Sequence, residues 1–325
     1  MNDRPRRLRS SAAMRELVAE TRVTASALVQ PHFVVAGDRA DVAIPELPGI
    51  SRMGVEPLLR RVAKDRELGI RTVLLFGVVD GKDARGSKGE DMTAPVHRAL
   101  AALDREFGDD ITLIADVCLC TYTDHGHCGL VQGQRVLNDE SLPLLAGQAR
   151  SLARAGADVI APSDMMDGRV AAIRAALDAD GRSDVAILSY AAKYASNFYG
   201  PFRAAADSAP KDGGPKNRKT YQMDYRNRRE AVREALLDQA EGADVLMVKP
   251  ALAYLDVIAD VKAAVDRPVA AYLVSGEYAA VEALAEKGLA DRGALVNEHL
   301  TAVKRAGADI LISYHSRPAL EHGWL

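Results

Sequence analysis

The sequence predicts an α/β fold, specifically a (β/α)₈ TIM barrel with an extended N-terminal arm. Eight short apolar segments alternate with segments of helical periodicity, which is typical of a parallel sheet with crossover helices. In a repeated motif a helix ends at a glycine and a buried strand begins three residues later; copies lie at 153–164, 238–250 and 304–315. Eight strands is the number that closes a barrel. An open doubly wound sheet is the alternative, although no Gly-rich dinucleotide motif follows the first strand.

The expected elements cover most of the chain. We predict strands at 28–35, 72–78, 112–119, 158–163, 185–191, 244–249, 269–275 and 310–315. We predict helices at 55–68, 92–106, 140–155, 168–180, 226–241, 253–265 and 277–305, the last interrupted around Gly288 and Gly293. Residues 1–26 are expected to form an arm that contacts another subunit, or else to fray. Residues 27–325 are expected to form one catalytic barrel.

Composition excludes several classes of partner. The chain has 325 residues and a formal net charge of -3, which gives no indication of nucleic-acid binding or of attraction to an anionic membrane surface. No apolar segment is long enough to cross a membrane, and the N-terminus lacks the hydrophobic segment of a signal peptide. We therefore expect a soluble, cytoplasmic protein with no nucleic-acid or membrane partner.

Two lysines stand where predicted strands end, which is where a barrel places its chemistry. Lys249 ends the sixth strand, and Lys193 follows the fifth. Because consecutive barrel strands are neighbours, two ammonium groups there would disfavour each other's charge and lower the pKa of at least one. A neutral amine at the end of a rigid strand can form a Schiff base. The alternative is two solvated lysines on separate loops.

All three cysteines of the chain lie within eleven residues, after the third predicted strand. Cys118, Cys120 and Cys128 are spaced C-x-C-x₇-C, and His125 and His127 lie inside the segment. Three thiolates can bind Zn²⁺ and leave a fourth position open, which is the catalytic pattern, whereas a histidine in that position would make a structural site. The spacing leaves open whether a histidine binds the metal. The alternative is three free buried cysteines.

Further polar residues follow other predicted strands. Residues 194–224 form a loop long enough to be a lid, and its cationic side chains would suit a substrate carboxylate. The alternative is a solvated basic loop. The other strand-end residues with polar side chains include Asp116, Ser163, Ser275 and Tyr314.

Five long motifs, in the same order along the chain, resemble the porphobilinogen synthase (5-aminolevulinate dehydratase) family. The segment GADVLMVKPALAYLD resembles its Schiff-base signature, and DVCLCTYTDHGHCG resembles its zinc-type cysteine segment. The other matching segments are SYAAKYASNFYGPFRAA, APSDMMDGRV and YLVSGEY. The one departure in these motifs is Thr121, where a proline is common.

The resemblance implies a reaction and a catalytic core. It implies condensation of two 5-aminolevulinate molecules to porphobilinogen with loss of two waters, in tetrapyrrole (haem) biosynthesis. Lys249 would form a Schiff base with the first substrate, and Lys193 would form a second one or act as acid and base. The zinc held by Cys118, Cys120 and Cys128 would act as a Lewis acid.

The resemblance also implies substrate contacts, a second metal and an assembly. Ser275 and Tyr314 would meet the first carboxylate. The remaining substrate-binding positions would be Asp116, Ser163, Tyr199, Phe202, Arg203, Arg218 and Gln222, with Arg203, Arg218 and Gln222 on the second carboxylate. Glu234 would hold an allosteric Mg²⁺ in members that use one, and the arm would embrace a partner, commonly in a homo-octamer. The competing functions are a Schiff-base aldolase, which needs one lysine and no thiolate metal, and a non-catalytic metal-binding barrel.

Overall fold

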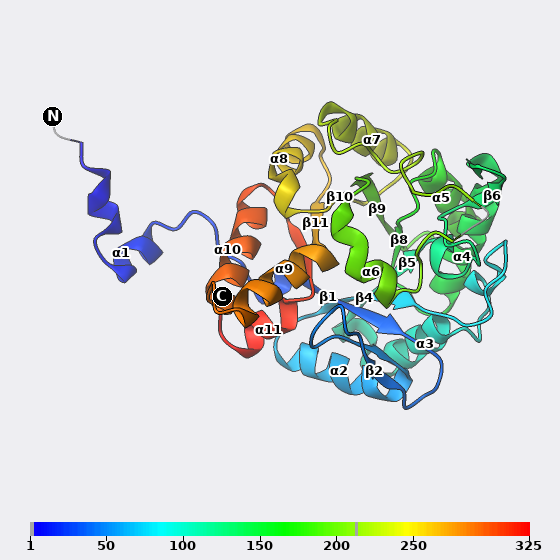
Figure 1. Ribbon diagram of the computed structural model, residues 1–325, viewed down its shortest axis with the longest axis horizontal. Coiled ribbons are helices and arrows are strands. Elements are labelled where there is room, and N and C mark those ends of the chain that lie inside the picture. The colour runs from blue at the N-terminus through cyan, green and yellow to red at the C-terminus, as the bar shows by residue number, and fades with distance from the viewer. Residues whose placement is uncertain (1–2, 212–213) are drawn as a thin grey trace.

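The computed structural model describes residues 3–211 and 214–325, so residues 212 and 213 of the predicted lid and residues 1 and 2 of the arm lie outside its description. Within those ranges eight parallel strands close into a barrel, because the last of them, β12, pairs with the first, β1 (Figure 1). The barrel strands are β1 (Leu28–Val34), β4 (Thr72–Gly77), β5 (Thr112–Val117), β8 (Val159–Pro162), β9 (Ala186–Lys193), β10 (Val245–Lys249), β11 (Val269–Leu273) and β12 (Ile310–Ser313). The predicted TIM barrel is confirmed.

Helices surround the barrel, and they agree closely with the helical segments expected from the sequence. They are α2 (Val55–Glu67), α3 (Pro95–Phe107), α4 (Leu142–Arg154), α5 (Arg169–Ala179), α7 (Arg229–Ala240), α8 (Leu255–Ala264), α9 (Ser275–Glu286) and α10 (Arg292–Arg305). The interrupted helix at 277–305 is therefore two helices, with Gly288 at a φ of 66° between them. Among the described helices, none has the length and apolar character needed to span a membrane.

Side chains of each barrel strand alternate between two apolar clusters. One cluster fills the barrel interior and includes Val29, Phe33, Leu74 and Met247. The other lies between the strands and the helices. This alternation follows from the two-residue period of a strand, and it decides which polar side chains at the strand ends point into the barrel.

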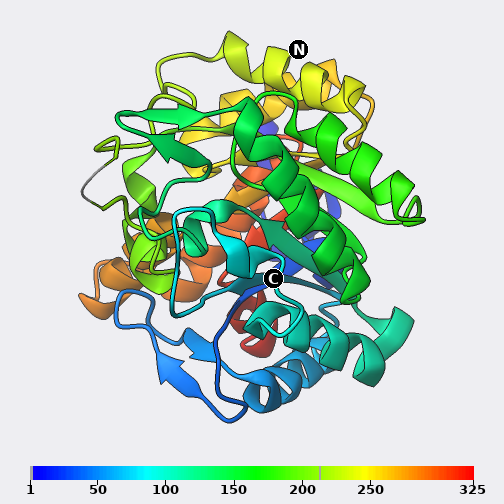
Figure 2. The ribbon, with the colours of Figure 1, turned by 90° about the vertical axis from the view of Figure 1, so that its right-hand side faces the viewer.

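Four features were not expected from the sequence. A hairpin of β2 (Asp41–Ala43) and β3 (Ser51–Met53) extends the sheet beyond β1, and a separate hairpin joins β6 (Leu130–Gln132) to β7 (Arg135–Leu137). The other two features are the short helices α6 (Gly200–Ala205) and α11 (Ser316–Glu321). The strands of both hairpins have three residues each, which is too short to show a period in sequence. In Figure 2 the β2–β3 hairpin, in blue, lies on the opposite side of the barrel from α7, in yellow-green.

The N-terminal segment extends away from the barrel (Figure 1). It contains a 3₁₀ turn at Pro5–Arg9 and the helix α1 (Ala12–Leu17), and neither has a buried residue. Leu17 exposes 75% of its surface, which is unusual for a leucine in a helix of a folded chain. The segment therefore has the exposed geometry of an arm.

Candidate active site

The strand alternation points Lys249 into the barrel. Met247 belongs to the interior cluster and Val248 to the outer one, so the next side chain points inward again. Lys249 is the last residue of β10 and is 4% exposed. An amine at this position is held by a rigid strand and is almost completely removed from water.

A bulge in β9 points Lys193 into the same space. Leu246 pairs with Ser189 and Val248 with Ala192, so β9 carries one more residue than β10 over this stretch. The extra residue reverses the side-chain alternation, as β-bulges do next to active sites. Lys193 then pairs directly with Lys249 across the two strands.

Aromatic rings surround the amine of Lys249. Its Nζ lies 4.2 Å from the ring centre of Tyr272, 4.9 Å from that of Tyr190 and 5.1 Å from that of Phe202. Burial and, after it, the positive charge of Lys193 lower the pKa of Lys249, and Asp116 opposes the change, so that the pKa is about 7. About half of the amines are therefore neutral and nucleophilic near pH 7.

Lys193 also approaches the ring of Tyr190. Its Nζ lies 5.5 Å from the ring centre of Tyr190 and donates a hydrogen bond to the carbonyl of Ser163. Asp116 ends up close to both lysines, and burial raises its pKa to about 6. Its Oδ1 has no hydrogen-bond partner among the described residues, which suits a carboxyl that exchanges a proton with a substrate.

The three cysteines form a compact buried triad. Their sulfur atoms all lie within 4.8 Å of one another, and those of Cys118 and Cys120 are 3.2 Å apart. Hydrogen bonds from Cys118 and Cys120 hold the pKa of Cys128 well below its usual value. Three thiol donors, one of them already favoured as a thiolate, fit a soft or borderline metal ion such as Zn²⁺.

The structure engages the ring of His127 away from the cysteines. Its Nδ1 lies 3.1 Å from the hydroxyl of Tyr221, and its Nε2 lies 2.8 Å from the carbonyl oxygen of Pro215. Both ring nitrogens are thus engaged by the lid, and the candidate metal group of the described residues contains only the three cysteines. A tetrahedral ion held by three thiolates keeps one position for water or substrate, which is the catalytic pattern.

The residues expected at the first carboxylate lie on adjoining elements. Ser275 begins α9, where its Oγ accepts the N–H of Phe202 at 2.9 Å and donates to the carbonyl of Phe198 at 3.2 Å. Tyr314 follows β12 and accepts a hydrogen bond from the hydroxyl of Tyr272 at 3.1 Å. Ser275 and Tyr314 are therefore linked to the aromatic rings around Lys249.

The lid residues contact different parts of the site. Phe202 and Arg203 lie on α6, and the hydroxyl of Tyr199 donates to the carbonyl of Lys249 at 3.2 Å. Arg218 is buried and donates to the carbonyls of Gly126 at 3.0 Å and Ser208 at 2.5 Å. Its guanidinium thus joins the lid to the cysteine loop.

Comparison with known proteins decides the family. A family model described as delta-aminolevulinic acid dehydratase matches residues 2–322. The enzyme of that name from Bacillus subtilis (strain 168) is 49% identical over 99% of this chain and 98% of its own length. That of Synechococcus elongatus is 47% identical, also over 99% of this chain. The chain belongs to the delta-aminolevulinic acid dehydratase family.

A solved structure of a family member extends this agreement to the whole fold. The delta-aminolevulinic acid dehydratase (porphobilinogen synthase) from Toxoplasma gondii ME49, in complex with the reaction product porphobilinogen, has a TM-score of 0.95 and 46% identity. It covers 99% of this chain and 92% of its own. The resemblance seen in the motifs is therefore confirmed, and the chain is a lyase of a metal-dependent family whose buried cysteines can hold a metal.

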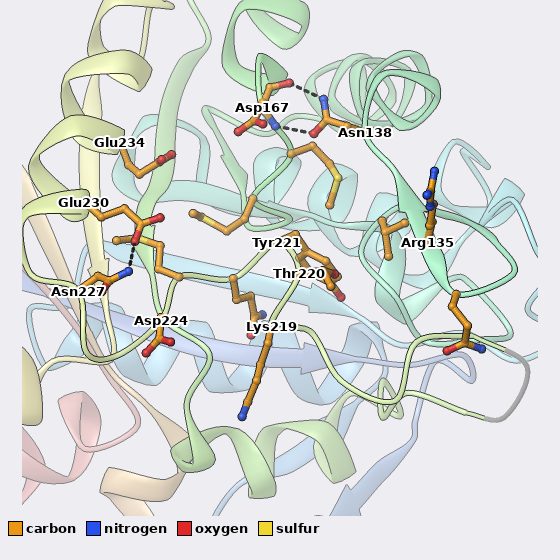
Figure 3. A pocket seen from close by; sticks show the side chains of 16 residues that line it. Arg135, Asn138, Asp167, Lys219, Thr220, Tyr221, Asp224, Asn227, Glu230 and Glu234 are labelled. Atoms are coloured by element: carbon orange, nitrogen blue, oxygen red, sulfur yellow. Dashed lines mark hydrogen bonds between the residues drawn. The ribbon is translucent and has the colours of Figure 1, made fainter.

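Two predicted residues of this dehydratase, Gln222 and Glu234, line a pocket of about 600 Å³ whose lining includes neither lysine (Figure 3). Glu234 lies on α7, and burial raises its pKa. Gln222 is 3% exposed, and neither atom of its amide has a partner among the described residues. Glu230 and Asp167 line the pocket as well, hydrogen-bonded to Asn227 and Asn138, respectively. Acidic groups thus gather here, and neither Lys193 nor Lys249 is among the residues that line the pocket.

Two tyrosines near the lysines were missed by the sequence argument. Tyr190 and Tyr272 are fully buried and supply the rings closest to Lys249 Nζ. The signal was available, because each occupies an inward position in a strand that ends at a polar residue. It was overlooked because a large aromatic residue inside a strand is ordinarily a core residue.

Proposed function

We propose that this chain is a porphobilinogen synthase that joins two molecules of 5-aminolevulinate with loss of two waters. The observation that carries the proposal is the convergence of two buried lysines and a thiol triad inside one barrel mouth. The family assignment and the product-bound relative from Toxoplasma gondii support the same reaction. A Schiff-base aldolase would need only one of the lysines and would leave the triad without a role.

Lys249 starts the reaction in this proposal. Its neutral amine adds to the ketone carbon of the first 5-aminolevulinate, the ketone oxygen leaves as water, and a C=N bond to Nζ forms. Lys193 and Asp116, which lie beside Lys249, are proposed to deliver a proton to that oxygen. Ser275 and Tyr314 bind the carboxylate of this first substrate, and Ser163 and Asp116 line the same space.

The second substrate binds under the lid. Arg203, Arg218 and Gln222 hold its carboxylate, and Tyr199 and Phe202 close over it and exclude water. Lys193 either forms a second Schiff base or transfers protons beside it. One C–C bond and one C–N bond then join the two molecules, the second water comes from the second ketone, and Lys249, together with Lys193 where it is also bound, is released as a free amine.

Cys118, Cys120 and Cys128 are proposed to hold Zn²⁺, which when bound supplies Lewis-acid polarisation of an oxygen or nitrogen of the second substrate. The buried, closely spaced thiols and the depressed pKa of Cys128 support this assignment. Glu234 is proposed to bind a regulatory Mg²⁺ within the acidic pocket. The exposed arm, residues 1–26, is proposed to contact a second copy in a homo-oligomer, for which an octamer is expected.

Trapping of the Schiff base tests this function. Incubation with 5-aminolevulinate and borohydride should leave one reduced substrate adduct that peptide mapping places on Lys249. Lys249→Met should abolish both the adduct and pyrrole formation, whereas Lys216→Met, an exposed lysine of the same lid, should change neither. An adduct confined to another lysine would overturn the assignment of Lys249. A trapped adduct without any pyrrole product would favour the aldolase.

A further inference from the structure

The lid helix α6 ends in a way that sets it apart from the other helices. The N–H of Asp207 bonds to the carbonyl of Ala204 at 3.3 Å, and that of Ser208 bonds to the carbonyl of Arg203 at 3.0 Å. This is a Schellman motif, in which the residue with left-handed backbone is usually glycine. Here that residue is Asp207, with a φ of 45°. A side chain that is kept at such a position has a reason to be there.

The carboxylate of Asp207 provides the reason, because it pairs with Lys82. Lys82 Nζ lies 2.7 Å from Asp207 Oδ2 and also donates to the carbonyl of Asp207. The Lys82 side chain is only 7% exposed, so these contacts must compensate its ammonium for the water that it loses on burial. Lys82 lies in the loop after β4, outside the lid.

A second cation reaches the same helix end from the unexpected β2–β3 hairpin. Arg52 of β3 donates from Nε to the carbonyl of Ala205 at 2.7 Å and from a terminal nitrogen to that of Ala204 at 2.5 Å. The two segments that flank this hairpin pack closely together. A Cβ added to Gly54 would lie 1.9 Å from the carbonyl oxygen of Gly37, so only glycine permits this approach. Cations at the C-terminus of a helix also oppose the negative end of its dipole.

The same six-residue helix carries the substrate contacts, with Arg203 in its last turn. Phe202 packs with its ring centre 5.1 Å from that of Phe76 and 5.7 Å from that of Phe33, and it lies over Lys249. Arg203 follows it directly. A shift of the helix would therefore move the side chains proposed to bind the second substrate.

We propose that Arg52 and Lys82 are positioning residues that latch α6 closed and so hold Arg203 at the second substrate. The proposal rests on the proposed function, since it assigns Arg203 to that substrate. Neither cation is assigned to the substrate: both act on the backbone and on Asp207 at the C-terminal end of the helix, directly after Arg203. The β2–β3 hairpin and the loop after β4 thereby become parts of the lid mechanism.

Asp207→Gly gives the sharpest test, because glycine adopts the left-handed backbone without strain. Relief of the backbone strain at residue 207 offsets part of the loss of the ion pair with the buried Lys82, so the barrel should remain folded. The KM for pyrrole formation should nevertheless rise about tenfold, the effect of losing one hydrogen bond to a charged group. The concentration of 5-aminolevulinate that half-saturates trapping on Lys249 should change about twofold or less, since a shift of α6 first affects Arg203. An unchanged KM would overturn the proposal.

Arg52→Met and Lys82→Met complete the design. Each should raise KM more than it lowers kcat, and each should speed hydrogen exchange of α6 amides while the barrel strands keep their protection. The double variant Lys82→Met/Asp207→Gly should raise KM little more than either single variant, because both changes remove the same ion pair. Arg52→Lys should recover part of the KM. Fully additive increases in KM for Lys82→Met and Asp207→Gly would contradict the latch. Unchanged hydrogen exchange of the α6 amides in these variants would contradict it as well. A wild-type enzyme without pyrrole product would instead contradict the proposed function.

Discussion

The charges around Lys249 can be changed one at a time, with opposite expected results. Lys193→Met removes the positive charge that lowers the pKa of Lys249, and Asp116→Asn removes the negative charge that raises it. Neighbouring strands are about 4.8 Å apart, and two unit charges at that separation in an effective dielectric of about 20 interact by roughly 3.5 kcal/mol, or about 2.5 pKa units, which is an upper bound because the strand spacing is the shortest separation of the two amines. The pKa of Lys249 should therefore rise by about one to two units in Lys193→Met and fall in Asp116→Asn.

The assay is the rate of reductive trapping on Lys249 as a function of pH, with the adduct located by peptide mapping. In the wild type the rate should rise through pH 7, because the neutral amine is the nucleophile and the pKa of Lys249 is about 7. The midpoint should move to higher pH in Lys193→Met and to lower pH in Asp116→Asn. Burial is the largest cause of the shift, so even Lys193→Met should titrate below the usual value of 10.5. Midpoints that move in the same direction would refute the electrostatic reasoning and point to general damage.

Three further perturbations test the metal site, the packing and the arm. Cys120→Ala should lose bound zinc and most turnover with an unchanged far-UV circular dichroism spectrum, and full activity would argue against a catalytic metal. Arg317→Met should lower the free energy of unfolding in urea by about 3–5 kcal/mol, since it leaves the buried carboxylate of Asp65 without its two-bond partner; a loss under about 1 kcal/mol would be inconsistent. Deletion of residues 1–26 should give a smaller particle by sedimentation with a folded barrel, and an unchanged particle mass would exclude the arm from assembly.

The barrel was predictable because its local signals agree with one another. Glycine-terminated helices, buried strands and their alternating order all indicate the same architecture, and each predicted strand lies within a few residues of the observed one. Lys249 was predictable for the same reason, since regular alternation along β10 points it inward. The β2–β3 hairpin was not, because its three-residue strands are set by tertiary pairing with β1 and not by their own pattern.

The position of Lys193 shows where sequence reasoning stops. Counting inward positions from Tyr190 along a regular strand would point Lys193 outward, and only the bulge in β9 brings it beside Lys249. No local pattern in residues 186–193 indicates that extra residue. The engagement of His127 by Tyr221 and Pro215 was equally hidden, because it depends on how the lid folds back on the cysteine loop.

The most direct test of the central claim is the colorimetric measurement of pyrrole formed from 5-aminolevulinate alone, with zinc supplied or removed. Purified wild-type protein should form porphobilinogen with zinc, lose this activity under a chelator, and regain it when zinc is returned. No pyrrole under any of these conditions would contradict the assignment of the reaction, and pyrrole formation indifferent to the chelator would contradict the role given to the three thiols.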